Sequence, residues 1–293
     1  MKKDDIYISV IIPVYNQKQQ LLTTLAKFDE QTYPKELFEV IVVDDGSNDI
    51  EAEDIEMFQN LLFNVEVIRQ ENKGRAIARN NGIRHANGDY IIFCDADRFP
   101  NQQFIKIFVE KIKQNDNNVA YIGNPKDFFG QLTNANDSNY CFKYSRESQY
   151  YRKISNIFSE DGTTNSGIAW AAFLVGNSCV SKKCLDEIGG FNELFNEWGF
   201  EHFELAFRML QNGVKICNVP NNINFHIPHS HNKNFYIDSM HKSVEIMNKA
   251  HKDYDFNSLI DYMVGKISLQ EFERIFSGSS GSIVCDQDIF FNL

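Results

Sequence analysis

The sequence predicts an α/β protein with a doubly wound, mostly parallel sheet and flanking helices. Over the first 124 residues, short apolar runs alternate with stretches that repeat apolar residues at helical spacing. The run at residues 40–43 is apolar at every position, which is typical of a strand covered by helices on both faces. This alternation indicates a series of strand–helix–strand units.

The first half of the chain supplies most of these elements. We expect strands at residues 8–12, 39–43, 65–68 and 90–94, and helices at residues 17–30, 75–86 and 101–114. Asn16, followed by Gln19 three residues later, marks a helix start, because such side chains satisfy the first backbone N–H groups of a helix. Gly88 after Asn87 marks a helix end.

The second half is less regular. Residues 126–166 are polar and weakly periodic, so we expect a long connection with some helix that lies over the active site. Further elements are expected as strands at residues 173–180 and 215–219 and as helices at residues 182–188 and 200–210. The tail is expected to be helical, with a capping box from Ser268 to Glu271.

Composition indicates a globular protein and argues against a nonspecific nucleic-acid binder and against a membrane-spanning protein. The chain has 293 residues, of which 43% are hydrophobic, enough for a sizeable core. A formal net charge of −11 argues against nonspecific nucleic-acid binding, because few cations remain to neutralise phosphates over a broad surface. No apolar run is long enough to span a bilayer and the start lacks a signal-peptide core. We therefore expect a cytoplasmic protein with reduced, structural cysteines.

Asp95 and Asp97 flank Ala96 at the end of the strand expected at residues 90–94. Carboxylates are hard oxygen ligands that suit Mn²⁺ or Mg²⁺, and a strand end can direct both toward the crevice at the carboxyl edge of a sheet. The pattern alone is a weak signal, because aspartate is common in turns. Its position among other motifs supports a metal-binding role.

Five short motifs, in this order, resemble the family-2 type of GT-A glycosyltransferases. They are Pro13-Val14-Tyr15-Asn16, Asp44-Asp45-Gly46-Ser47, the run from Asn72 to Asn80, Asp95-Ala96-Asp97, and the run from Gly189 to Gly199. The resemblance covers residues 8–233. It implies a GT-A domain over residues 1–235, with a nucleotide-binding half at 1–124 and an acceptor and catalytic half at 125–235. Residues 236–293 then form a helical C-terminal extension.

The resemblance also assigns residues to the UDP-sugar donor. It places Pro13 and Tyr15 at the donor, gives Asp45 the role of accepting from the uracil N–H, and puts Lys73, Arg75 and Arg79 near the diphosphate. Two alternatives stay open. Asp45 can instead cap a helix, and the arginines can pair with Asp45 or Asp95 and order the site.

A metal site is implied in the same way. Asp97 is expected to ligate the cation, and Asp95 to contact the ribose or a metal-bound water. His226 and His229 fall where the β-1,4-galactosyltransferase branch carries metal-binding residues. Because imidazole suits Mn²⁺ better than Mg²⁺, Mn²⁺ is the expected cofactor, with Mg²⁺ as the substitute. A separate zinc site formed by His226, His229 and His231 is the rival interpretation.

Residues 189–205 resemble the acceptor and catalytic segment of the β-1,4-galactosyltransferase and chondroitin-synthase-like branch. There, a Trp-Gly-x-Glu-Asp run contacts the acceptor and supplies a general base, which implies acceptor contacts from Trp198 and Gly199. This chain carries His202 in place of the aspartate. Either His202 or Glu201 can therefore be the base, because imidazole also accepts a proton near neutral pH. Trp198 can instead belong to the core.

These expectations combine into a metal-dependent, inverting transferase that moves a hexose or N-acetylhexosamine from a UDP-sugar to an acceptor hydroxyl. The acceptor can be a glycan, a lipid-linked sugar or a peptide. A lipid-linked acceptor would bring the amphipathic C-terminal helices near a membrane, although their packing on the domain is favoured.

The alternative is a catalytically inactive relative that binds sugar nucleotides or carbohydrate, and the histidine at position 202 is its best support. A nicotinamide oxidoreductase is disfavoured, because the chain lacks G-x-G-x-x-G after its first strand. A nucleotidyltransferase is disfavoured because no glycine-rich loop follows that strand.

Overall fold

The computed structural model describes residues 5–59, 61, 63–115, 118–197, 199–228 and 233–277. Its strands are β1 (Ile8–Val14), β2 (Phe38–Asp44), β3 (Asn64–Arg69), β4 (Tyr90–Cys94), β5 (Arg98–Pro100), β6 (Val119–Phe128), β7 (Ser145–Glu147), β8 (Asn177–Ser181) and β9 (Lys215–His226). Its α-helices are α1 (Lys18–Asp29), α2 (Ala52–Gln59), α3 (Arg75–His85), α4 (Phe104–Ile112), α5 (Ser138–Lys143), α6 (Gln149–Ile154), α7 (Lys182–Ile188), α8 (Glu201–Gln211), α9 (Lys233–Ala250), α10 (Asn257–Met263) and α11 (Leu269–Ser277).

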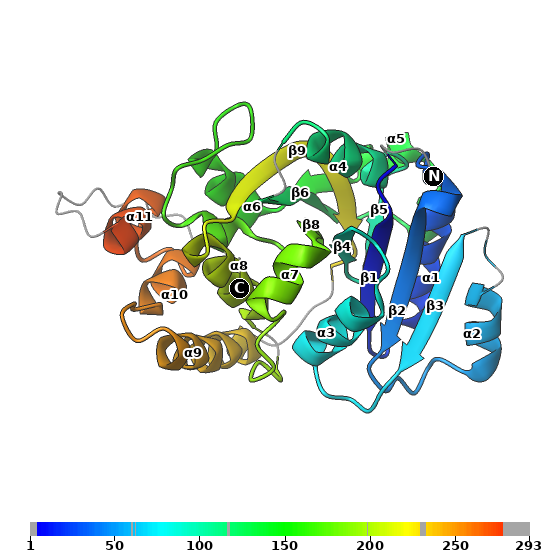
Figure 1. The fold of residues 1–293 in the computed structure, drawn as a ribbon, viewed down its shortest axis with the longest axis horizontal. Coiled ribbons are helices and arrows are strands. Elements are labelled where there is room, and N and C mark those ends of the chain that lie inside the picture. The colour runs from blue at the N-terminus through cyan, green and yellow to red at the C-terminus, as the bar shows by residue number, and fades with distance from the viewer. Residues whose placement is uncertain are drawn as a thin grey trace.

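The described strands form one curled sheet of nine strands with helices around it (Figure 1). Its order is β3-β2-β1-β4-β8-β6-β9-β5, with β7 paired to β6. Strands β3, β2, β1 and β4 run parallel, β8 is antiparallel to β4 and β6, and β9 is parallel to β6. The predicted fold class is confirmed. Because β1, β2 and β4 share a direction, their carboxyl ends meet at one edge, where ligands of such sheets bind.

Alternate side chains of the central strands enter two separate cores. In β1, Val10 and Ile12 pack into the cluster that includes residues of α1 and α4, whereas Ile11 packs into the cluster that includes residues of α3 and α8. Every side chain at residues 40–43 of β2 is fully buried. The continuous apolar run thus serves both faces of the sheet, as predicted.

Helices α9, α10 and α11 pack against the domain on the side away from α1 and α2 (Figure 1). The Trp170 ring lies at this contact, with ring centroids 5.5 Å from Phe256, 5.9 Å from Phe272 and 5.2 Å from Phe276. The C-terminal helices therefore pack on the domain, as favoured from the sequence, and the proposed boundary after residue 235 falls inside α9. No helix in the described ranges is both long and apolar enough to cross a membrane.

Some elements match their expected bounds and others were not expected. Strand β4 and helix α7 begin and end at the predicted residues, while α2, β5 and β6 were not predicted as elements. Residues 124–127 belong to β6, and two of their polar side chains bond to side chains on neighbouring strands. Asn124 Nδ2 donates to Glu147 at 2.8 Å, and Asp127 Oδ1 lies 3.0 Å from the Nδ1 of His226.

One predicted helix cap is wrong and another is confirmed. Asn16 adopts a φ of 53°, and its Oδ1 accepts a hydrogen bond from the backbone N–H of Asn48 at 2.8 Å, so its side chain does not cap α1. Near the C-terminus, the backbone N–H of Glu271 donates to Ser268 Oγ at 3.1 Å, as the capping box predicts.

Candidate active site

A cleft of about 670 Å³ opens at the carboxyl ends of β1, β2 and β4. Its walls come from the loop after β1, the start of α3, the turn after β4, the loop at residues 196–197, the end of β9 and the start of α9. Predicted site residues that line it are Pro13, Tyr15, Asp45, Arg75, Asp95, Asp97 and His226. The volume suits a cofactor-sized ligand.

Asp45 ties the end of β2 to the start of α3. Its Oδ1 accepts from the backbone N–H of Lys73 at 2.9 Å and from Gln70 Nε2 at 2.8 Å, and its Oδ2 accepts from the backbone N–H of Gly74 at 2.9 Å. Asp45 thus holds the two residues that precede α3, and it does not cap the helix itself, because α3 has no side-chain cap. A Cβ at Gly74, where φ is 91°, would lie 2.7 Å from the carbonyl oxygen of Asn196, so the position requires glycine.

The cationic side chains of Lys73 and Arg75, at the start of α3, differ in their position relative to the cleft. Arg75 is exposed and lines the cleft, in the first turn of a helix whose N-terminal N–H groups attract anions. Lys73 is also exposed but does not line the cleft, and its Nζ lies 3.7 Å from Glu71. Arg75 is therefore the better placed of the two to meet an anion in the cleft.

Arg79 is buried and joins two acidic side chains from distant parts of the chain. Its Nη2 donates to Asp95 Oδ1 at 2.8 Å, and its Nη1 donates to Glu201 Oε1 at 2.7 Å. The guanidinium also lies 5.5 Å from the centroid of the Phe191 ring. With only 1% of its side chain exposed, Arg79 orders the site through these partners, which is the alternative to a direct diphosphate contact.

Asp95 is fixed from two further sides. Arg98 Nε donates to its Oδ2 at 3.3 Å, and a Cβ at Gly176 would come within 2.4 Å of that oxygen. Burial opposes ionisation of Asp95, but Arg79 and Arg98 outweigh it and hold the pKa of the carboxyl well below its usual range. Asp95 is therefore a charged group in a fixed position beside the cleft.

Asp97 and His226 face one another within the cleft. The Nε2 of His226 lies 3.8 Å from Asp97 Oδ2, and its Nδ1 lies 3.0 Å from Asp127 Oδ1. A hydrogen bond from Nδ1–H to Asp127 directs the lone pair of Nε2 toward the Asp97 carboxylate. Gln17 Nε2 donates to the same oxygen of Asp97 at 3.3 Å. Two electron-pair donors at this separation can share one cation.

Asp97 and His226 fit a divalent cation whose remaining coordination positions are filled by a bound ligand and water. A carboxylate oxygen and an imidazole nitrogen together suit Mn²⁺. Among the described residues, no three His, Cys, Asp or Glu side chains converge to hold a metal. Cations at phosphate sites usually take their remaining ligands from the phosphate and from water. His229, the third predicted ligand, lies outside the described residues, as does His231 of the rival zinc site.

The two candidate bases, Glu201 and His202, lie at the start of α8 and do not line the cleft. Burial alone would raise the pKa of Glu201, but the neighbouring His202 and Arg79 lower it to about 2. The His202 side chain is 17% exposed, and its Nδ1 lies 3.6 Å from Glu201 Oε1, beyond hydrogen-bond distance. A carboxylate with so low a pKa is a weak base near neutral pH, whereas imidazole is not.

The ion pair of Glu201 is expected to make stability depend on pH. Its pKa falls from 4.5 to about 2 on folding, so the unfolded chain binds more protons between these values. The stabilisation, about 3 kcal/mol, is present above the unfolded pKa and is lost as the pH falls through the folded one. Urea unfolding at several pH values measures it. The wild type should lose more stability on acidification than Glu201→Gln, and an equal loss in both would contradict the assignment.

The predicted acceptor contacts are placed only in part. Gly199 is buried, and a Cβ there would lie 1.8 Å from Ser243 Oγ on α9. Glycine at this position therefore allows close packing between the loop and the helix. Trp198 lies outside the described residues.

The cleft also contains residues that the sequence analysis did not single out. Arg98 and Gln17 each directly follow a motif that was recognised, so their positions were a usable signal. Glu197 lies inside the run from Gly189 to Gly199, but nothing in that run distinguishes it. Tyr236 lies on α9 and had no signal, since it reaches the cleft only because the helix packs there.

Two family models match adjoining parts of the chain. The model described as Glycosyl transferase family 2 matches residues 9–174, more than half of the chain. A second model, described as N-terminal domain of galactosyltransferase, matches residues 163–232. The second match covers the segment with the expected acceptor contacts, base and histidines.

Several known proteins are similar in sequence to this chain over most of its length. Chondroitin synthase of Escherichia coli is 29% identical over 238 residues, which are 75% of this chain and 34% of that protein. The uncharacterized glycosyltransferase YfnE of Bacillus subtilis is 28% identical over 70% of this chain and 61% of its own length. Hyaluronan synthase of Pasteurella multocida is 30% identical over 70% of this chain and 23% of its own length. The chain thus spans less than two thirds of each of these relatives.

Solved structures of S. aureus TarS share the fold. The crystal structure of TarS in complex with UDP-GlcNAc has a TM-score of 0.61 and 22% identity, and covers 91% of this chain and 77% of that one. The expected GT-A fold is confirmed by this likeness. From the family match over residues 9–174, the chain belongs to glycosyl transferase family 2.

Proposed function

We propose that the protein transfers a hexose or N-acetylhexosamine from a UDP-sugar to an acceptor hydroxyl, with inversion at the anomeric carbon. The observation that carries this proposal is the cleft in which Asp45, Arg75, Asp97 and His226 come together at the carboxyl ends of three strands. Family membership supports the reaction class. The UDP-GlcNAc complex of TarS supports the donor class.

Separate residues are assigned to the uridine and to the diphosphate. Asp45 accepts from the uracil N–H in addition to its bonds to the residues before α3, because an ionised carboxylate has about four lone-pair sites. Tyr15, which is 46% exposed, offers an aromatic face in the same cleft. Arg75 faces the diphosphate, where the N-terminus of α3 also favours negative charge.

Asp97 and His226 are assigned to the cation, and Mn²⁺ matches their oxygen and nitrogen donors. A cation bound there neutralises the charge that develops on the departing UDP. Asp127 fixes the tautomer of His226, and Gln17 holds the Asp97 carboxylate in place. Asp95 is assigned to the ribose or to water on the cation.

The transfer is a single displacement. The acceptor oxygen bonds to the anomeric carbon while the bond from that carbon to the diphosphate oxygen breaks, and the acceptor proton passes to a base. We assign His202 rather than Glu201 as this base, since Glu201 is buried, is paired with Arg79 and has a pKa of about 2. UDP leaves from the face opposite the incoming acceptor, so the configuration inverts.

A catalytically inactive relative that binds sugar nucleotides is the second candidate function. The observation that favours it is that neither His202 nor Glu201 lines the cleft. Such a protein would retain the donor contacts of Asp45 and Arg75 and bind UDP without consuming any donor.

Incubation with a panel of UDP-sugars, Mn²⁺ and acceptor glycosides tests the proposal, with released UDP as the readout. We expect one donor class to be consumed, and proton NMR of the product to show the inverted anomeric configuration. UDP binding without turnover of any donor would favour the inactive relative. A retained configuration would contradict the single displacement.

A further inference from the structure

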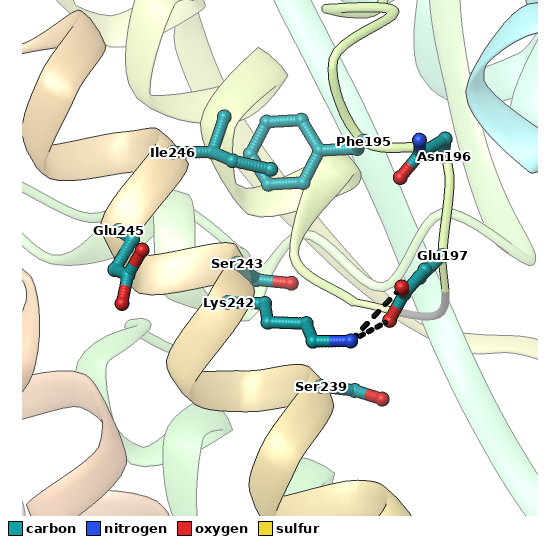
Figure 2. A pocket seen from close by; sticks show the side chains of 8 residues that line it. All are labelled: Phe195, Asn196, Glu197, Ser239, Lys242, Ser243, Glu245 and Ile246. Atoms are coloured by element: carbon teal, nitrogen blue, oxygen red, sulfur yellow. Dashed lines mark hydrogen bonds and ion pairs between the residues drawn. The ribbon is translucent and has the colours of Figure 1, made fainter.

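A second pocket of about 200 Å³ lies between the loop at residues 195–197 and helix α9 (Figure 2). The loop contributes Phe195, Asn196 and Glu197, and the helix contributes Ser239, Lys242, Ser243, Glu245 and Ile246. The volume is below the range for drug-sized ligands and suits a single small ring. None of the roles assigned above uses this pocket.

The pocket has an apolar end and a polar end (Figure 2). Ile246 lies beside the ring of Phe195, which is 2% exposed. At the other end, Lys242 Nζ donates to both carboxylate oxygens of Glu197, each at 2.9 Å. A sugar ring needs both kinds of surface, because its C–H groups pack on apolar side chains while its hydroxyls bond to charged groups.

The pocket and the donor cleft share a wall. Asn196 and Glu197 line both of them. Helix α9 also borders both, since Tyr236 lines the cleft and Ser239, three residues later, lines the pocket. The two sites therefore adjoin across this loop, and a transfer requires the acceptor hydroxyl to come within about 3.5 Å of the anomeric carbon on the cleft side.

The shared wall is held closely on both sides. A Cβ at Gly74 would lie 2.7 Å from the carbonyl oxygen of Asn196, and a Cβ at Gly199 would lie 1.8 Å from Ser243 Oγ. The absence of side chains at these two positions lets the loop pack directly against α3 and α9. A wall fixed in this way is preorganised for binding, which lowers the entropy cost of ordering a ligand.

We propose that this pocket is the acceptor subsite and that it binds one uncharged sugar ring. The inference rests on the proposed function and names its acceptor class. Lys242 is paired with Glu197, and Glu245 lies 3.7 Å from Lys249, so the described lining offers an anion no unpaired cation, and a uronic acid or a phosphate is disfavoured. Helix α9 begins at Lys233, after the family matches end at residue 232, so neither family model covers this side of the pocket.

Ligand-observed NMR with UDP and Mg²⁺ present tests the subsite. The probes are methyl β-N-acetylglucosaminide and methyl β-galactoside, which are uncharged, and methyl β-glucuronide, which is anionic. We expect the wild type to bind an uncharged glycoside in preference to the glucuronide. Lys242→Met should weaken that binding about tenfold, because it removes a charged hydrogen-bond donor. Lys183→Met is the matched control, since Lys183 is also an exposed helical lysine that pairs with a glutamate, here Glu187 at 3.7 Å, and should bind as the wild type does.

Kinetics distinguish failure of the subsite from failure of the proposed function. With the bound glycoside as acceptor, Lys242→Met should raise the KM for the acceptor about tenfold more than it changes kcat. An unchanged acceptor KM, a preference for the glucuronide, or no glycoside bound by the wild type would each overturn the subsite. If the glycoside binds as expected but no UDP-sugar is consumed, the pocket stands as a sugar site and the transferase proposal fails.

Discussion

Replacing Arg79 by methionine is expected to lower turnover about 100-fold and to destabilise the fold by about 3–5 kcal/mol. The change removes the shared partner of Asp95 and Glu201, so Asp95 keeps only Arg98 as a bonded cation among the described residues, and the buried Glu201 loses its guanidinium partner. It also releases Asp95 two residues from Asp97, and a displacement of about 1 Å at a reacting centre costs about 100-fold in rate. UDP release at saturating donor measures the turnover, and urea unfolding measures the stability.

Two further variants separate positioning from a general loss of stability. Arg79→Lys keeps the charge, but one ammonium cannot bridge two carboxylates as the guanidinium does, so stability should recover more than turnover. Arg84→Met lies on the same helix with 60% of its side chain exposed, and should change stability by less than about 0.5 kcal/mol. Wild-type turnover in a folded Arg79→Met variant would rule out the positioning role.

Asp97→Ala is expected to abolish cation-dependent turnover, a loss of about 1000-fold, while the fold stays intact. Its carboxylate is the oxygen donor that faces His226 Nε2 at 3.8 Å. The backbone bond at this position is kept, since the N–H of Ile227 donates to the Asp97 carbonyl oxygen at 2.9 Å. Titration of Mn²⁺ against UDP release measures the effect, and the melting temperature checks the fold.

Asp186→Ala is the matched control for this variant. Asp186 is 54% exposed and pairs with Lys182 one turn away on α7, far in sequence from every cleft residue assigned to the donor. It should keep the turnover and the Mn²⁺ dependence of the wild type. If Asp97→Ala also kept them, the cation would have to be held by other residues.

The donor-side strands were predictable because local pattern and fold agree there. Strand β4 is an apolar run that ends directly in the Asp95–Asp97 motif, and its observed bounds are the predicted ones. Strand β6 was not predictable in this way. Its residues 124–127 are Asn, Pro, Lys and Asp, which break the apolar run, and a Cβ at Gly123 would lie 2.2 Å from Asn177 Oδ1. Its pairing therefore depends on neighbours that come from other parts of the chain.

The site residues also fall into those that the local sequence predicted and those that depend on tertiary packing. Asp97 and His226 were predicted together because Asp97 ends the Asp95–Asp97 motif and His226 falls at a metal-binding position of the family that the sequence resembles, and the structure brings them within 3.8 Å. The bond between Arg79 and Glu201 joins residues 122 positions apart, and no local pattern encodes the burial that makes it strong. Tyr236 reaches the cleft through the packing of α9, which was expected only as a C-terminal extension.

Calorimetric titration of UDP tests most directly whether the cleft holds the donor diphosphate through a cation on Asp97 and His226. With Mn²⁺, the wild-type protein should bind UDP, and either removing Mn²⁺ with EDTA or introducing Asp97→Ala should weaken that binding about tenfold or more. Equal UDP affinity under all three conditions would contradict a cation-assisted donor site in this cleft.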